Sequence, residues 1–230
     1  MALRVARFEP PISDSLRAAV EGFDCVLTSD AGEGEVLVRD FLSTGRFAEA
    51  AANGTSTTYL AIDPTGDPRL VGYVTLAVTQ VFLTGAERRQ AEVEDRAVFG
   101  AVRAAMLGVD HRVQGQGVGG ALLDSAIGHA ADLSRSVATR FVVVDALPDR
   151  DGWYAQRGFR ECRSERERER GERHGTTSMY LDLGPDPRQL LGPSAAVNLR
   201  RVAREAMTSV HATQRAAVAA ARKRARRSGG

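Results

Sequence analysis

Apolar and polar residues follow two different rhythms in the part of the chain upstream of Gly184. Short runs rich in β-branched residues predict strands. These runs cover residues 58–62, 70–79, 101–109, 140–144 and 178–183. Apolar residues spaced three and four positions apart predict helices at 13–20, 34–51 and 119–130. Because strands and helices are mixed, we expect an α/β domain with a mixed central sheet flanked by helices.

The segments between these elements carry weaker signals. Partial alternation after Val71 predicts a hairpin between Val71 and Leu83, and the polar stretch 84–95 predicts a loop or short helix. Glutamate and arginine nearly alternate over 160–173. This pattern favours a solvated, self-neutralising loop or hairpin extension, to which we assign no chemistry.

A break in the pattern at Gly184-Pro185-Asp186-Pro187 divides the chain. Proline lacks the amide hydrogen and restricts the preceding residue, so we place a boundary between a domain at 1–185 and a tail at 186–230. The tail is rich in alanine and arginine, and Ser194 can cap a helix, so we predict a basic helical tail.

Charge is distributed unevenly between these two parts. The tail has ten basic residues against two acidic ones, a net charge of +8, so residues 1–185 carry −6. Such asymmetry suggests a polyanionic partner or an interaction arm. A solvated helix with an arginine-rich end fits it equally well.

Length and composition exclude several classes of protein. The 230 residues suffice for one domain with appended sequence. No stretch approaches the roughly 20 apolar residues of a membrane span, and the start lacks the apolar run of a secretion signal, so we expect a cytoplasmic protein without a membrane partner. Cys25 and Cys162 have no metal-ligand neighbours in the sequence, so we predict core-filling side chains and no metal site.

Four glycines fall within six residues between the strand at 101–109 and the helix that follows: Gly115, Gly117, Gly119 and Gly120. Glycine lets the backbone turn sharply and lets a ligand approach the amide hydrogens. With the positive end of the following helix, the segment can bind an anion such as a pyrophosphate without lysine. The glycines alone also fit a tight turn or a dinucleotide-binding loop. A Walker loop is excluded because it needs Gly-Lys-Ser/Thr, and the only lysine is in the tail.

The pattern Gln114-x-x-Gly117-x-Gly119 resembles the Gln/Arg-x-x-Gly-x-Gly/Ala signature of the GNAT acetyltransferase superfamily. The similarity extends to the strand at 70–73, the strand at 141–145 and the Trp-Tyr-Ala-Gln-Arg-Gly-Phe segment at 153–159, and covers roughly residues 1–185. It implies a GNAT-like mixed sheet and an N-acetyltransferase with acetyl-CoA as the acetyl donor. In one departure, Leu147 stands where the family has Asn or Asp, seven residues before the tyrosine.

The resemblance also implies which residues bind acetyl-CoA. The end of the strand at 101–109 would bind the acetyl and pantetheine part, and the glycine loop would bind the pyrophosphate. The implied contacts are Leu107, Gly108, Val109, Gln114, Gly115, Gln116, Gly117, Val118, Gly119 and Gly120.

Tyr154 is the predicted catalytic residue. A phenol of pKa near 10 stays protonated at neutral pH and can protonate a thiolate leaving group. A packed ring with its hydroxyl in solvent is the alternative, against which the surrounding motif argues. The strand at 101–109 has no carboxylate to act as base. An α-amine, with a pKa near 8, needs little help from a base. Asp110, His111 and Asp145 could act through water, although His111 also fits a solvated loop position.

Two short segments, Val109-Asp110 before the loop and Phe23-Asp24-Cys25, resemble the GNAT toxins of toxin-antitoxin pairs, which acetylate aminoacyl-tRNA. This likeness implies aminoacyl-tRNA and a ribbon-helix-helix antitoxin as partners, and a homodimer could also form. Arg88-Arg89, Arg112 and the tail could attract tRNA phosphates. The alternatives are a GNAT enzyme acting on a protein N-terminus or a small-molecule amine, and a non-catalytic module that binds acetyl-CoA or nucleic acid.

Overall fold

The computed structural model describes residues 3–26, 32–65, 69–96 and 98–184. The predicted tail at 186–230 lies outside these residues, so the domain boundary and the helical tail remain predictions.

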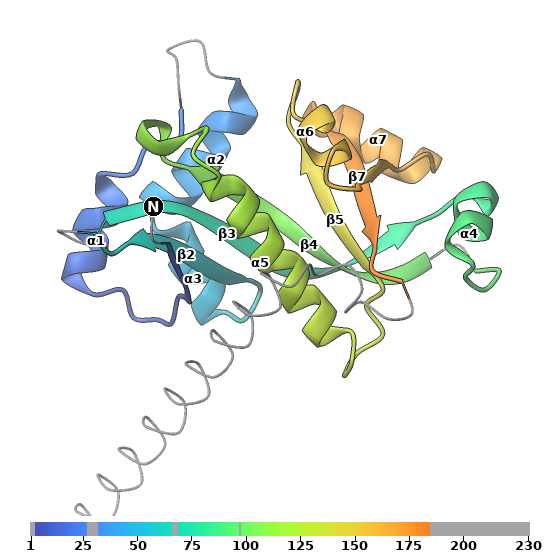
Figure 1. Ribbon diagram of the computed structural model, residues 1–230, viewed down its shortest axis with the longest axis horizontal. Coiled ribbons are helices and arrows are strands. Elements are labelled where there is room, and N and C mark those ends of the chain that lie inside the picture. Colours follow the sequence, from blue (N-terminus) through green and yellow to red (C-terminus); the bar gives the residue numbers. More distant parts are fainter. Residues whose placement is uncertain (1–2, 27–31, 66–68, 97, 185–230) are drawn as a thin grey trace, which may run out of the picture. The chain divides into compact units, whose positions relative to one another are not determined.

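Across the described residues, seven strands form one mixed sheet in the order β1-β2-β3-β4-β5-β7-β6 (Figure 1). The strands are β1 (Arg4–Arg7), β2 (Thr57–Asp63), β3 (Arg69–Phe82), β4 (Val98–Val109), β5 (Phe141–Ala146), β6 (Arg160–Glu161) and β7 (Thr177–Asp182). Only β4 and β5 pair in parallel, and every other neighbouring pair is antiparallel. The single parallel pair lies at the centre of the sheet, where α5 makes the crossover.

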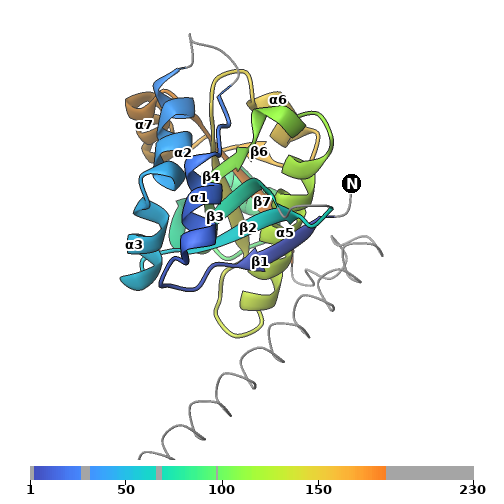
Figure 2. The ribbon, with the colours of Figure 1, turned by 90° about the vertical axis from the view of Figure 1, so that its left-hand side faces the viewer.

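Helices cover both faces of this sheet (Figure 2). One face, called the α5 face here, carries α5 (Val118–Leu133) and α6 (Asp151–Ala155). The opposite face, called the α7 face, carries α1 (Asp14–Glu21), α2 (Glu33–Ser43), α3 (Arg46–Ala52) and α7 (Glu165–His174). The short helix α4 (Gly85–Ala91) follows β3, and the 3-10 helix η1 (His111–Val113) follows β4. None of the described helices has the length and apolar character needed to cross a membrane.

The core differs between the two faces. On the α5 face, aliphatic side chains of the helix such as Leu122 and Leu123 pack on Val74 and Val144 without exposure beyond 1%. On the α7 face, aromatic rings dominate, with Phe47 and Tyr73 under the N-terminal helices and Phe141 further along the sheet. Burial of each such side chain stabilises the fold by about 1.5–3 kcal/mol.

The sequence patterns gave most of these elements. All five predicted strands and the helices at 13–20 and 119–130 are confirmed. The predicted hairpin between Val71 and Leu83 is wrong, because the whole run is one 14-residue strand, β3. The predicted helix at 34–51 is two helices, because Gly45 takes φ 79° and interrupts it.

The segment at 160–173 is not a solvated loop. It contains β6 and the helix α7. Glu167 faces inward with 1% exposure, and a Cβ at Gly171 would lie 2.6 Å from the carbonyl oxygen of Thr176. In the sequence, the alternating charges gave no sign of this inward face. The charge of Glu167 is neutralised in the fold by an ion pair with Arg170.

Candidate active site

The site begins where β4 and β5 separate (Figure 1). Their parallel pairing runs from Ala101–Phe141 to Ala104–Val144 and then stops, although β4 continues beside β3 and β5 continues beside β7. A bulge in β4 at Ala105 interrupts the register with β3 at this point. Beyond it, the backbone groups of 105–109 on the side facing β5 have no ladder partner among the described strands. Apart from the Val109 carbonyl, which accepts from the Gln114 side chain, they are available to a ligand.

The glycine loop connects the end of β4 to α5. Gly115 has φ 77° and Gly117, the N-cap of α5, has φ 86°, a backbone region that favours glycine. A Cβ at either glycine would meet nothing within 4 Å. The space over the loop is therefore open, and a ligand can approach the backbone directly.

The N-terminus of α5 supplies the charge complement for an anion. Ala121 donates the first intrahelical hydrogen bond, to the Gly117 carbonyl. The amides of Val118, Gly119 and Gly120 precede it and have no helical partner, and the helix dipole adds partial positive charge there. This arrangement fits a pyrophosphate.

Several predicted residues meet around Gly119. A Cβ at Gly119 would lie 3.5 Å from Val109 Cγ2, 3.6 Å from Trp153 Cζ2 and 4.0 Å from Leu107 Cδ2. Gly108 points to the opposite face, where a Cβ would lie 2.7 Å from the Tyr73 ring. Leu107 and Val109 thus face the glycine loop, whereas Gly108 is paired with Tyr73 of β3.

The loop is fastened to the N-terminal segment at 22–25. His111 donates its amide to the Asp24 carbonyl at 2.8 Å. The side-chain amide of Gln114 donates to the carbonyls of Cys25 and Val109, each at 3.0 Å. Because this amide nitrogen is engaged internally, Gln114 holds the loop in shape and offers its backbone to a ligand.

Asp110 has a structural role in the loop after β4. It is fully buried, caps η1 and receives two hydrogen bonds from the Arg112 guanidinium, at 2.7 and 2.5 Å. Burial opposes ionisation, but the hydrogen bonds from Arg112 outweigh it and lower the pKa of Asp110. An engaged carboxylate of low pKa is a poor general base.

Tyr154 lies on α6 within an aromatic cluster. Its ring meets Trp153 and Phe159 edge-on, with centroids 4.8 and 5.6 Å away, and the Arg157 guanidinium lies 3.8 Å from the centre of the Trp153 ring. Burial raises the pKa of Tyr154 to about 12. The hydroxyl therefore remains protonated throughout the neutral range.

Leu147, the departure from the family pattern, follows β5 and packs on the start of α2. A Cβ at Gly34 would lie only 2.2 Å from Leu147 Cδ2. The ion pair between Arg150 and Glu35, at 3.6 Å, joins the same two segments. Leu147 therefore links the loop after β5 to α2 by packing instead of supplying a polar contact.

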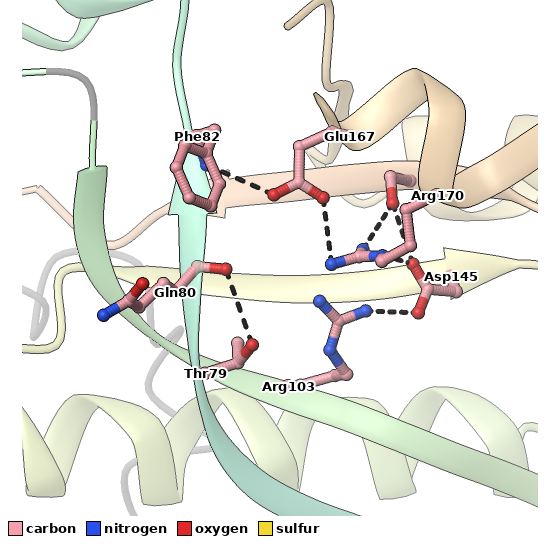
Figure 3. A network of polar contacts seen from close by, with 8 residues as sticks. Thr79, Gln80, Phe82, Arg103, Asp145, Glu167 and Arg170 are labelled. Atoms are coloured by element: carbon pink, nitrogen blue, oxygen red, sulfur yellow. Dashed lines mark hydrogen bonds and ion pairs between the residues drawn. The ribbon is translucent and has the colours of Figure 1, made fainter. Parts of the chain in front are cut away.

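A polar cluster on the α7 face was missed in the sequence (Figure 3). Arg103 of β4 and Arg170 of α7 both donate to Asp145 of β5, and Ser178 of β7 donates to it at 2.8 Å. Burial opposes ionisation of Asp145, but Arg103 and Arg170 outweigh it, so the pKa of Asp145 is lowered. The members of this cluster lie on four elements separated in the chain, so no local sequence spacing could have predicted that they meet.

Comparison with known proteins identifies the class of this fold and site. A family model described as the acetyltransferase (GNAT) domain matches residues 35–179. The chain belongs to the GNAT acetyltransferase family. It is an N-acetyltransferase, and acetyl-CoA is its acetyl donor.

Solved structures share the fold at low identity. A tyrosine-to-phenylalanine mutant of KacT has 20% identity and a TM-score of 0.61, over 79% of this chain and 95% of that one. AtaT complexed with acetyl-methionyl-tRNAfMet has 18% identity and a TM-score of 0.61, with the same coverage. An AtaT mutant bound to acetyl-CoA and to the C-terminus of the antitoxin AtaR has 19% identity and a TM-score of 0.56, over 78% and 92%. No curated protein matches the sequence.

Proposed function

We propose that this enzyme transfers an acetyl group from acetyl-CoA to the α-amine of aminoacyl-tRNA and acts as a toxin by blocking translation. The observation that carries the proposal is the absence of an unengaged carboxylate on the described part of β4 and its loop, where Asp110 is buried against Arg112. A side-chain amine of pKa about 10.4 would need a base, whereas an α-amine of pKa about 8 needs little help. AtaT, which shares the fold, has been solved with acetyl-methionyl-tRNAfMet.

The donor fits the α5 face. The amides of 114–120 would hold the pyrophosphate, and the backbone amides of Leu107 and Val109 would hold the pantetheine and the thioester carbonyl. Amide hydrogens directed at that carbonyl stabilise the negative charge that develops on its oxygen during attack.

Tyr154 would supply the proton for the leaving group. The amine nitrogen attacks the thioester carbon, the C–S bond breaks, and the thiolate takes the hydroxyl proton of Tyr154. The nitrogen loses a proton to water, and the Tyr154 phenolate regains one from water, so the protons balance. Burial raises the pKa of a thiol as well as that of a phenol, and in this protein it brings Cys25 to about 12. A thiolate released into a desolvated site is likewise a stronger base than in water, which favours proton transfer from Tyr154.

The partners follow from this acceptor. Aminoacyl-tRNA as substrate places the reaction in the cytoplasm, and a toxin of this type needs an antitoxin, which we propose to be a ribbon-helix-helix protein. AtaT binds the C-terminus of its antitoxin AtaR. Co-expression with the neighbouring gene product, followed by co-purification, tests this partner.

Incubation with acetyl-CoA and charged tRNA, followed by mass spectrometry of the released aminoacyl-adenosine, tests the proposed function. We expect an N-acetylated aminoacyl-adenosine. Acetylation of peptide N-termini or free amines, with no acetylation of charged tRNA, would support a GNAT enzyme that acts on a protein N-terminus or a small-molecule amine. Tight acetyl-CoA binding without transfer to any amine would support a non-catalytic binding module.

A further inference from the structure

Asp145 occupies a special place in the sheet. It directly follows Val144, the last β5 residue paired with β4, so its side chain lies where the two strands separate. It points to the α7 face, because Arg170 of α7 bonds to it at 2.7 Å (Figure 3). The glycine loop leads into the helix on the opposite face. A donor bound along the loop and a group bound at Asp145 would therefore meet at the separation of β4 and β5.

The Arg103–Asp145 pair retains hydrogen-bonding capacity on this face. Asp145 Oδ1 accepts from Arg170 and Ser178, whereas Oδ2 accepts only from Arg103 among the described residues. Of the five N–H groups of the Arg103 guanidinium, one has a partner within the described part of the chain. The two side chains are 13% and 31% exposed, so solvent or a ligand can reach them.

The rest of the cluster fixes this pair in position. Glu167, which is 1% exposed, holds Arg170 at 2.9 Å and accepts from the Phe82 amide at 3.2 Å. The two guanidiniums and two carboxylates of the cluster sum to zero charge. Ala105, two residues after Arg103 at the β4 bulge, is exposed and small.

We propose that Arg103 and Asp145 together recognise an α-aminoacyl group, with Asp145 Oδ2 accepting from the amine and Arg103 donating to the adjacent carbonyl oxygen. In such a group the amine nitrogen and the carbonyl oxygen are attached to two adjacent carbons. A hydrogen-bond acceptor and a donor held side by side, as in Asp145 and Arg103, therefore match both. A lysine side chain or a polyamine has no carbonyl next to its amine. The inference rests on the proposed function and narrows its acceptor chemistry.

The test compares leucinamide with 3-methylbutylamine, the amine obtained when the carboxamide group of leucinamide is replaced by hydrogen. The measured quantity is the ratio of their kcat/KM values with wild type and with variants. Intrinsic reactivity of the two amines cancels when variant and wild-type ratios are compared. Where turnover of these small acceptors is too slow, the same ratio is read from their inhibition constants against charged tRNA.

In the Arg103→Gln/Asp145→Asn double variant the preference for leucinamide should fall about 10- to 100-fold, the loss expected for hydrogen bonds to charged groups. The double variant leaves no unpaired charge, and unchanged acetyl-CoA affinity by calorimetry shows that it is folded. The matched control is Arg140→Gln/Asp182→Asn, because Arg140 and Asp182 form a comparable ion pair at the far end of β5, at 2.8 Å. This control should keep the wild-type ratio.

An unchanged ratio in the double variant, with charged tRNA still acetylated by wild type, would overturn this inference and leave the proposed function standing. If wild type instead prefers leucinamide but does not acetylate charged tRNA, and the double variant loses that preference, the α-aminoacyl inference stands and the tRNA proposal fails. Should the double variant lose acetyl-CoA binding, Arg103→Lys decides: it keeps the charge but not the planar fork, and should lower the ratio in the same direction.

Discussion

The two faces of the central sheet offer ligands different chemistry. On the α5 face, the glycine loop presents backbone amides at an open surface, and the nearby side chains are apolar or aromatic. On the α7 face, the centre of the sheet carries Arg103 and Asp145, and their charges and those of Arg170 and Glu167 on α7 compensate one another. Backbone groups suit an acetyl donor of fixed shape that carries a pyrophosphate. Side chains can be varied to suit different acetyl acceptors.

The hydroxyl of Tyr154 gives the largest expected effect, because the α5 face otherwise acts through backbone groups. Tyr154→Phe keeps the ring packing with Trp153 and Phe159 and removes only the acid. Turnover should fall about 10²- to 10⁴-fold with acetyl-CoA affinity unchanged. The control is Tyr59→Phe, since Tyr59 is a partly buried tyrosine on the same face that packs on His129. Equal turnover in Tyr154→Phe and wild type would return Tyr154 to a packing role.

The glycine loop gives the next largest effect. Gly117→Ala places a side chain at φ 86°, which costs about 1–2 kcal/mol and shifts the first amides of α5. Acetyl-CoA affinity should fall about 10- to 100-fold, because hydrogen bonds to a charged phosphate weaken. Gly45 is a matched control, since it is the N-cap of α3 with φ 79° and an equally open Cβ position.

Gly45→Ala should lose similar stability in thermal unfolding and bind acetyl-CoA normally. If both variants bind normally in calorimetry, the α5 face does not recognise the donor through this loop, and the contrast between the faces fails.

The charged cluster of the α7 face should appear in the pH dependence of stability. Arg103 and Arg170 lower the pKa of Asp145 in the folded state, whereas an unfolded Asp titrates near 3.9. The stabilisation is therefore complete above about pH 4 and is lost as pH falls through the lower folded pKa. Asp145→Asn should lower the free energy of unfolding by about 1–3 kcal/mol at pH 7, and the difference should shrink below pH 4. Urea unfolding at both pH values measures this, and a difference that does not change with pH would contradict it.

The same contrast explains how much the sequence could predict. The α5 face was predictable because its chemistry is local, with four glycines and the following helix inside one short segment, and β4 and β5 show as apolar β-branched runs. The α7 face was not, because Arg103, Asp145 and Arg170 come together only through strand register and the docking of α7. Neither arginine has a distinctive neighbour in the sequence.

Two further misses have the same origin. The alternating charges of α7 gave no sign that Glu167 is buried, because its partner Arg170 neutralises it in three dimensions. β1 was missed because Arg4–Arg7 is short and half polar, and only its pairing with β2 defines it as a strand. Patterns within one segment predicted elements and the donor loop, whereas pairings between segments had to be observed.

The smallest expected effect concerns His129 on the α5 face, which tests whether this face excludes charge. The imidazole packs on the Tyr59 ring with centroids 4.1 Å apart, and its Nε2 is buried without a partner among the described residues. Burial lowers the pKa of His129 and outweighs the opposing effect of Asp132, and Arg7 adds a smaller lowering effect. Folding therefore favours the neutral ring. The stability that depends on the neutral His129 ring is complete above about pH 6.5, near the pKa of an unfolded histidine. It is lost as the pH falls from there through the lower pKa of His129 in the folded state.

His129→Phe keeps an aromatic ring against Tyr59 and cannot be protonated. Between pH 7 and 5, wild type should lose more of its free energy of unfolding than this variant, because only wild type has to keep a buried imidazole neutral. Carboxylates titrate mainly below this window and the other histidines are common to both proteins, so the difference isolates His129. Chemical denaturation of both proteins at the two pH values measures it. Equal losses would mean that the α5 face accommodates an imidazolium, and exclusion of charge would then no longer distinguish it from the α7 face.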